Sequence, residues 1–237
     1  MIVTNNISKK FGKLTVLNSI SLSCNKGETI SLIGPNASGK TTFIKCILGM
    51  VIPESGTILF GNENISGKYI YRNNIGYMPQ IGRYPDNMTI RQIFDMIIDL
   101  RKNNIKEPDR EQITLFGLEH IFNKRMRTLS GGTRQKVSAS LAFLFNPEVL
   151  ILDEPTAGLD PVSCEILKEK IRKEKQKGKL ILITSHILSD LDDLVSEIIY
   201  FNEGSLLFHK SISQLRNDTG EDKLSRAIAS VMKINQA

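Results

Sequence analysis

The sequence predicts an α/β fold built around a mostly parallel sheet. The apolar run Thr29–Ile33 leads into a glycine-bearing turn and then into a helical pattern, which is the strand–turn–helix context of a phosphate-binding loop. Two later runs, Val149–Leu152 and Leu180–Ile183, are apolar throughout, as is typical of strands that a parallel sheet buries on both faces. Helical patterns separate these runs, so we expect strands and helices to alternate along the chain.

The turn after the first of these runs carries two glycines followed by lysine and threonine. Its residues are Gly34, Pro35, Asn36, Ala37, Ser38, Gly39, Lys40, Thr41 and Thr42. Backbone N–H groups in such a turn form an anion-binding nest, and the following helix adds its own free N–H groups. The Lys40 ammonium would lie against the β- and γ-phosphates, and the Thr41 hydroxyl could bind Mg²⁺. The loop therefore predicts a nucleoside triphosphate site; a plain strand-to-helix turn is the alternative.

Composition and charge restrict the class of protein. No apolar run approaches the roughly 18 residues that a membrane-spanning helix needs, and the N-terminus lacks a secretory pattern, so we expect a cytoplasmic chain. The net charge of +6 fits nucleic acid, an anionic membrane or a polyphosphate site. Because the excess is diffuse and lacks interleaved aromatic residues, we expect no nucleic-acid partner. The lysine-rich run Lys168–Lys179 predicts a solvated helix face, and Cys46 beside an apolar stripe predicts a small core residue.

The beginning and the middle of the chain differ in pattern. Val3–Ser23 is strand-like, and Phe11 precedes a glycine turn. This ring could stack on a purine base, or it could belong to the core. Thr57–Phe60 and Ile75–Met78 also indicate strands. Helical patterns then dominate, so we expect a helical subdomain over about residues 80–146, inserted between strands of the sheet.

A second helix N-terminus lies in this middle region, within Leu129–Gln135. Ser130, Gly131 and Gly132 precede an evident helix there. The first N–H groups of that helix would be free to bind an anion. Most turns of this kind are merely turns, and that alternative stays open.

Polar residues follow the later apolar runs. Asp153 could hold Mg²⁺, and Glu154 could polarise a water for attack on the γ-phosphate, because α/β folds bind ligands at the carboxyl ends of strands. Two surface acids are the alternative. His186, after the next run, could face the same phosphate or cap the following helix. Asp160 is expected to cap the helix that it precedes.

The chain ends with a hairpin and an amphipathic helix. Ile198–Phe201 and Leu206–Phe208 flank a turn that contains glycine. From about residue 222 the apolar residues recur at helical spacing, and they are Leu224, Ala227, Ile228, Val231 and Met232. We expect this helix to dock on its own domain; contact with a membrane or a partner is the alternative.

These motifs, in this order, resemble the ATP-binding cassette family, specifically the nucleotide-binding subunits of ABC transporters, from about Ile2 to Phe208. The resemblance implies a P-loop NTPase of ABC type, with a mostly parallel core sheet, an N-terminal antiparallel β subdomain and an inserted helical subdomain. Residues 1–216 would form the ATPase domain, and residues 217–237 the C-terminal amphipathic helix. The chain is most similar to ABC-2-type exporters, and its C-terminal stretch has a faint similarity to the ATPase of the transporter that matures the copper site of nitrous oxide reductase.

The resemblance implies a role for each motif. Gly34–Thr42 corresponds to Walker A, Asp153 and Glu154 to the end of Walker B, Leu129–Gln135 to the signature, Gln80 to the Q-loop glutamine, Asp160 to the D-loop aspartate, His186 to the switch histidine and Phe11 to the ring that stacks on adenine. The implied catalytic residues are Lys40, Gln80, Glu154 and His186, and the implied Mg²⁺ ligands are Thr41, Gln80 and Asp153. The whole loop Gly34–Thr42, including Lys40 and Thr41, would bind ATP together with Phe11, Ser130, Gly131, Gly132 and Asp160.

The resemblance also implies partners. Two cassettes, expected here as a homodimer, would pair head to tail with each ATP between Walker A of one and the signature of the other. Ser130 and Gly132 would grip the γ-phosphate, and a water activated by Glu154 would hydrolyse ATP with Mg²⁺ present. Gln80 would report the nucleotide to a transmembrane permease, which would hold the chain at the inner face of the cell membrane.

Departures from the commonest family pattern are mild. Ala37 stands where glycine is frequent, Thr133 where glutamine is common and Phe11 where tyrosine is usual. None removes a charge or a base, so we expect an active site. A soluble ABC ATPase acting on nucleic acid or the ribosome is the alternative function, but the long coiled-coil insertion or second cassette that it needs is missing from the sequence. A non-hydrolysing scaffold is a third class, against which Asp153, Glu154 and His186 argue.

Overall fold

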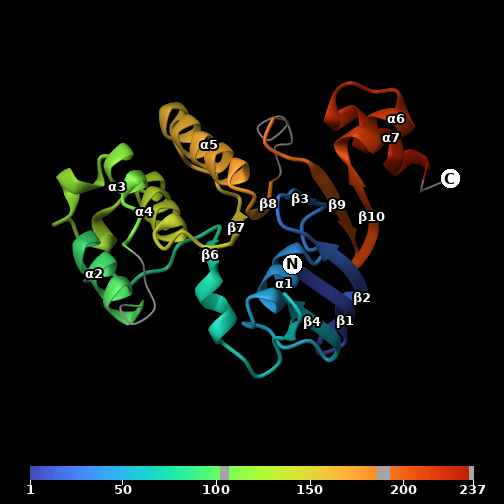
Figure 1. Ribbon diagram of the computed structural model, residues 1–237, viewed down its shortest axis with the longest axis horizontal. Helices are drawn as coiled ribbons and strands as arrows, with labels where there is room; N and C mark the ends of the chain where they lie inside the picture. The colour runs from blue at the N-terminus through green and yellow to red at the C-terminus, as the bar shows by residue number, and fades with distance from the viewer. Residues whose placement is uncertain (102–106, 186–192, 235–237) are drawn as a thin grey trace.

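The computed structural model describes residues 1–101, 107–185 and 193–234, which form two sheets flanked by helices (Figure 1). The smaller sheet is antiparallel and has the order β2-β1-β4-β5, with β1 Ile2–Phe11, β2 Leu14–Cys24, β4 Ser55–Phe60 and β5 Glu63–Asn64. The larger sheet has the order β10-β9-β3-β8-β7-β6, with β3 Thr29–Ile33, β6 Ile75–Met78, β7 Val149–Asp153, β8 Leu180–Thr184, β9 Glu197–Asn202 and β10 Ser205–Ser211. Its strands are parallel except for β10, which forms the expected hairpin with β9. The predicted fold class is confirmed.

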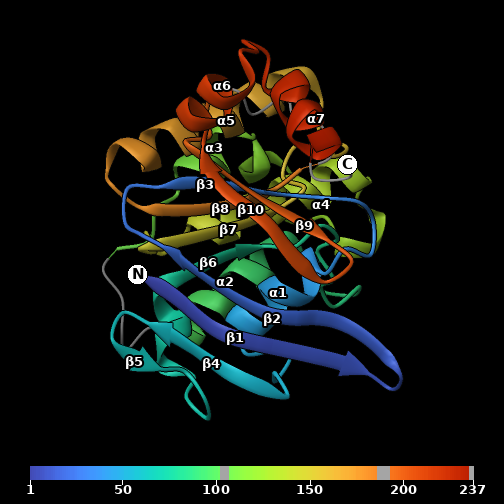
Figure 2. The same cartoon turned by 90° about the vertical axis from the view of Figure 1, so that its right-hand side faces the viewer.

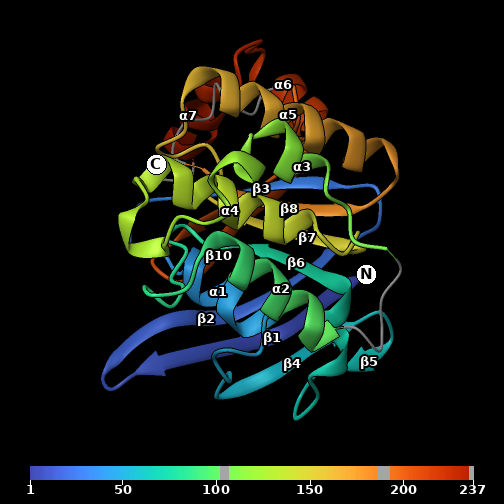
Figure 3. The ribbon, with the colours of Figure 1, turned by 90° about the vertical axis from the view of Figure 1, so that its left-hand side faces the viewer.

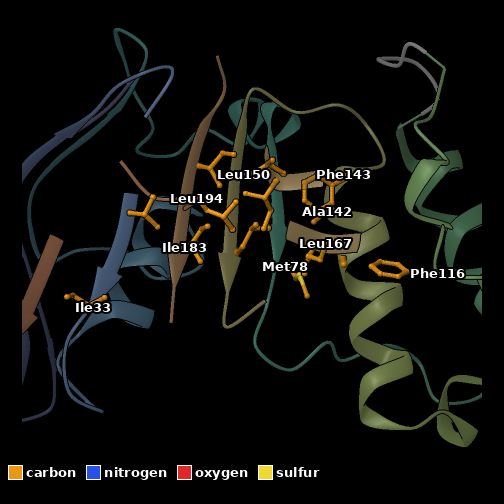
Figure 4. Close-up of a cluster of buried hydrophobic side chains, with 14 of the residues drawn as sticks. Ile33, Met78, Phe116, Ala142, Phe143, Leu150, Leu167, Ile183 and Leu194 are labelled. Atoms are coloured by element: carbon orange, nitrogen blue, oxygen red, sulfur yellow. The ribbon is translucent and has the colours of Figure 1, made fainter. Parts of the chain in front are cut away.

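The core sheet is buried on both faces and divides the interior into two hydrophobic cores. Successive side chains of a strand point to opposite faces, so in β7 Val149 and Ile151 enter one core while Leu150 and Leu152 enter the other. The first core contains helix α1 (Lys40–Ile47), which lies between the two sheets (Figure 2). The second core lies on the helical side and is drawn in Figure 4. The apolar runs of the sequence are continuous because both faces of these strands are buried.

The inserted helices cover one side of the core sheet (Figure 3). They are α2 Ile90–Arg101, α3 Glu111–Leu115 and α4 Gly131–Phe143, with short 3-10 turns at Leu118–Ile121 and Met126–Thr128 between α3 and α4. A capping box starts α2: the Thr89 N–H donates to Gln92 Oε1 at 2.9 Å, and the Gln92 N–H donates to Thr89 Oγ1 at 3.2 Å. Among the helices of the described ranges, none combines the length and the hydropathy that crossing a bilayer requires.

Two helices close the described chain, α6 (Ile212–Thr219) and α7 (Leu224–Ile234). The apolar stripe of α7 is buried in the second core, so this helix docks on its own domain as expected. The sequence analysis missed α6, and the boundary expected after residue 216 falls inside it. A capping box formed by Ser211 and Gln214 marks its start. The start of the helix expected after His186 falls on residues 186–192, which lie outside the described residues.

The expectation of a solvated lysine-rich face is wrong in part. This run ends helix α5 (Pro161–Gln176), where Lys170 and Glu174 are only 2% and 1% exposed. The Lys170 ammonium lies 2.6 Å from Asp109 Oδ2, 2.7 Å from Glu111 Oε2 and 3.3 Å from Glu174 Oε1. Lys179, just before β8, also pairs with Glu174. The Lys170 ammonium is buried together with carboxylates from the start of α3, and the network ties α3 to α5.

Removal of the shared cation should be costly. Lys170→Met leaves Glu174 and two further carboxylates without their common partner, so we expect the free energy of unfolding to fall by about 3–5 kcal/mol. Lys68→Met removes an exposed pair with Glu63 and should cost far less, because solvent screens that pair. Urea denaturation measures both variants, and equal losses would contradict the role given to the network.

The network also predicts how the stability of the fold depends on pH. Hydrogen bonds from Lys170 and then Lys173 lower the pKa of Glu111 to about 2. A carboxylate with a depressed pKa in the folded state contributes stability above its ordinary pKa of 4.5, and this contribution is lost as the pH falls toward 2. Lys170→Met should therefore show a smaller loss of stability across this acid range than the wild type.

Candidate functional site

The loop over residues 34–42 connects β3 to α1, and its shape depends on close backbone contacts. A Cβ atom at Gly34 would lie 2.1 Å from the Phe201 carbonyl oxygen, and one at Gly39 would lie 2.6 Å from the Val16 carbonyl oxygen. Both glycines also have positive φ angles, 146° and 105°. Glycine is therefore required at these positions because the loop is pressed against β9 and β2.

Ala37 is the residue of this loop that departs from the glycine pattern. Its φ angle is 62°, in the left-handed region that side chains disfavour. The backbone conformation is thus the one that a glycine would adopt without strain, and the alanine side chain is accommodated at an energetic cost.

A cavity of about 330 Å³ opens over the loop. Its walls gather most of the expected site residues from distant parts of the chain: Phe11, Asn36, Ala37, Ser38, Gly39, Lys40, Thr41, Thr42, Gln80, Asp153 and Glu154, together with Leu14, Val16 and Thr184. They meet because β3, β8 and β7 are parallel neighbours whose carboxyl ends share one edge of the sheet. Gly34 and Pro35 do not line the cavity, and His186 lies outside the described residues.

The Lys40 ammonium lies within the loop. Its Nζ donates to the carbonyl oxygens of Gly34 and Pro35, each at 2.8 Å. Burial lowers the pKa of Lys40, while the charges of Glu154 and Asp153 act in the opposite direction. An anion entering the cavity would thus meet a cation that two backbone carbonyl groups hold in place.

The acids after β7 are held by the neighbouring strand. Thr184 lies opposite Asp153 in β8, and its Oγ1 donates to Asp153 Oδ1 at 2.5 Å. The Glu154 N–H donates to both the Oγ1 and the carbonyl oxygen of Thr184, at 3.0 and 3.2 Å. The Asp153 carboxylate, the Thr41 hydroxyl and the Gln80 amide oxygen line one cavity, and oxygen donors of this kind suit Mg²⁺. No cluster of three or more His, Cys, Asp or Glu side chains suited to a metal occurs in the described ranges.

Phe11 is a surface residue of the cavity. Its side chain is 52% exposed, so the core alternative is wrong. The Lys9 ammonium lies 5.4 Å from the centre of its ring. An exposed aromatic ring at the rim of an anion-binding cavity offers a flat surface on which a base can stack.

The signature residues form a separate cluster, and Ser130, Gly131, Gly132 and Asp160 do not line the cavity. Ser130 caps α4, because its Oγ accepts from the Thr133 N–H at 3.2 Å. Asp160 caps α5 and pairs with Lys136 of α4 at 2.9 Å; this hydrogen bond holds the pKa of Asp160 well below its usual range. A Cβ atom at Gly132 would lie 2.6 Å from the Gly158 carbonyl oxygen, so the two helix starts pack closely.

Two contacts of the site were not predicted from the sequence. One is that of Thr184, and the other is that of Gln135, assigned only to the signature segment, whose Nε2 donates to the Glu154 carbonyl oxygen at 3.3 Å. A signal for Thr184 existed, because it ends the apolar run that pairs with β7. The contact of Gln135 with Glu154 depends on the packing of α4 and has no local signal.

Comparisons with known proteins agree with this geometry. The family described as "ABC transporter" matches residues 17–157. The linearmycin resistance ATP-binding protein LnrL of Bacillus subtilis is 31% identical over 242 residues, covering 100% of this chain and 77% of the relative. The Nod factor export ATP-binding protein I of Ralstonia nicotianae is 32% identical over 202 residues; the match covers 84% of this chain, which spans only 63% of that relative's length.

Solved structures show the same fold. The ATP-binding subunit of an ABC transporter superposes with a TM-score of 0.88 at 25% identity, covering 98% of this chain and 99% of the other. A dimeric ATP-binding cassette in a post-hydrolysis state, bound to ADP and phosphate, superposes with a TM-score of 0.80 at 22% identity, over 90% and 99% of the two chains. At that identity the second likeness concerns the fold alone.

The strain at Ala37 can be tested directly. Ala37→Gly should raise the free energy of unfolding by about 0.5–1 kcal/mol, because relief of the left-handed strain exceeds the entropy that glycine adds to the unfolded chain. Ala229→Gly, on the exposed face of α7, should instead lower it by about 1 kcal/mol. Urea denaturation of both variants gives the signs, and a loss of stability in Ala37→Gly would refute the strain.

Proposed function

This chain belongs to the ABC transporter family, and from that premise we propose that it binds and hydrolyses ATP as the nucleotide-binding subunit of a transporter. The observation that carries the proposal is the single cavity in which an anion-binding loop, Lys40 and the two acids Asp153 and Glu154 converge. A cation and an anion nest on one wall and carboxylates on the other are what a triphosphate and its attacking water require.

The phosphates would bind along the loop. Its backbone N–H groups and the N-terminus of α1 favour negative charge, and Lys40 would exchange two backbone carbonyls for phosphate oxygens. Adenine would stack on the exposed ring of Phe11. The base and the phosphates would then span the cavity between β1 and the sheet edge.

Hydrolysis would use Asp153 and Glu154 at the end of β7 together with residues of the loop. Thr41, Gln80 and Asp153 would hold Mg²⁺, which when bound neutralises charge on the phosphates. Glu154 would take a proton from the attacking water, and its place at the end of β7 keeps it at the cavity edge. His186 would orient that water.

The separate signature cluster supports a dimer. Ser130, Gly131 and Gly132 lie at the start of α4 but do not line their own chain's cavity. They would serve the nucleotide of a second copy, arranged head to tail as a homodimer, with the N-terminus of α4 directed at the γ-phosphate. The solved cassette that shares the fold is described as dimeric.

A permease subunit would dock on a groove beside the helical subdomain. A hollow of about 220 Å³ lies between the end of α1, β6, α2 and α4, and apolar residues such as Met50, Ile97 and Leu141 line it. Met50 is 61% exposed. Gln80 follows β6, which forms one wall, so a change at the nucleotide could reach the groove. The chain would thus sit at the inner face of the membrane.

The base can be tested by one substitution. Glu154→Gln should keep ATP binding and lose about 10²–10⁴-fold in hydrolysis, because a general base is removed while the shape is retained. The variant should also accumulate as an ATP-bound dimer, measured by size exclusion with light scattering. Glu63→Gln, on the distant strand β5, is the matched control and should behave as the wild type. If Glu154→Gln hydrolysed ATP at the wild-type rate, Glu154 would not be the general base.

The docking groove predicts that a substitution at Met50 weakens binding of the membrane partner. Met50→Glu should reduce recovery of a polytopic membrane protein with the tagged chain from gently solubilised membranes, because a carboxylate, which Arg72 and Arg101 of the same hollow would attract, replaces an exposed apolar side chain. Leu207→Glu, an equally drastic change on β10, should leave recovery unchanged. Recovery of ribosomes or nucleic acid in place of a membrane protein would favour the soluble class of ABC ATPase.

A further inference from the structure

One hydroxyl group connects the two acids of the site. Thr184 is 1% exposed, and its Oγ1 donates to Asp153 Oδ1 and accepts from the Glu154 N–H. A hydroxyl has one proton to donate and lone pairs to accept with, so both bonds form at once. Asp153 is itself buried, at 5% exposure, and this bond sets the direction in which its carboxylate points.

The backbone of Glu154 is held from both sides. Its φ angle is 51°, in the left-handed region that non-glycine residues adopt only when their surroundings hold them there. Its N–H is bonded to Thr184, and its carbonyl oxygen accepts from Gln135 Nε2 at 3.3 Å. Gln135 is 5% exposed and comes from α4, whose first residues form the signature cluster.

We propose that Thr184 is a positioning residue for the ATP hydrolysis proposed above, on which this inference rests. Its hydroxyl fixes the Asp153 carboxylate in the orientation that receives Mg²⁺, and it anchors the strained turn that aims Glu154 at the water. Gln135 completes the hold from the opposite side. Neither residue touches the reacting atoms; each acts through the acid that it fixes.

Loss of the hydroxyl should therefore change metal dependence and not merely stability. In Thr184→Val the side chain keeps its shape, but the Asp153 carboxylate loses its donor and becomes free to rotate. In Thr184→Ser the hydroxyl remains. A role limited to packing would make the serine variant the worse of the two, because serine lacks the methyl group that valine retains.

The test is a Mg²⁺ titration of both variants. In Thr184→Val the Mg²⁺ concentration for half-maximal hydrolysis should rise about tenfold, within the range seen when a partner of a metal ligand is lost. The Mg²⁺ dependence of the affinity for a fluorescent ATP analogue should shift equally, and Thr184→Ser should follow the wild type. Thr29→Val is the matched control, because the Thr29 hydroxyl is buried in the same sheet without a hydrogen-bond partner in the described residues.

Gln135→Met tests the contact with Glu154 separately from the contact with Asp153. It should lower hydrolysis at saturating Mg²⁺ and leave the half-maximal Mg²⁺ concentration unchanged, because it touches Glu154 and not Asp153. Unshifted Mg²⁺ titrations in Thr184→Val would overturn the proposal. If the wild type failed to hydrolyse ATP, the proposed function would fall, whereas the analogue titration would still decide whether Thr184 orients Asp153.

Discussion

Burial of the core sheet on both faces is the constraint on which this molecule depends. The cavity is assembled from residues as distant as Phe11 and Thr184, and it exists only because β3, β8 and β7 lie side by side. Two hydrophobic cores, one on each face, hold these strands in that order. The favourable free energy of removing both faces from water therefore supports a polar edge that contributes little stability of its own.

The residues of the candidate site lie in two separate groups, one around the cavity and one at the start of α4. The phosphate loop, the acids and Phe11 surround one cavity, while the signature residues stand at the start of α4 and pack against the segment before α5. Gln135 joins the two places within one chain, since it lies on α4 and bonds to the backbone of Glu154. One hydrogen bond thus links Glu154, the proposed base, to the helix that Ser130 caps.

The sequence predicted those features of the fold that depend on residues close together in the chain. The apolar runs predicted β3, β7 and β8, and the glycine spacing predicted the loop, because both depend on neighbours in sequence. The burial of Lys170 could not be predicted, since its partners Asp109 and Glu111 lie far away along the chain. Helix α6 was missed because it is short and buries only Leu215, which leaves no stripe to recognise. The Thr184 hydroxyl acquires its role only from the register of two strands.

The contact between Asp153 and Thr184 has a consequence for how the sheet assembles. Apolar side chains on both faces make β7 and β8 tolerant of sliding past one another, because a shift by one residue exchanges one hydrophobic side chain for another. Such a shift would leave a buried carboxylate facing a residue with no hydroxyl in the right place, which is energetically costly. The hydrogen bond between Asp153 and Thr184 therefore favours the native register of β7 against β8 as the sheet forms.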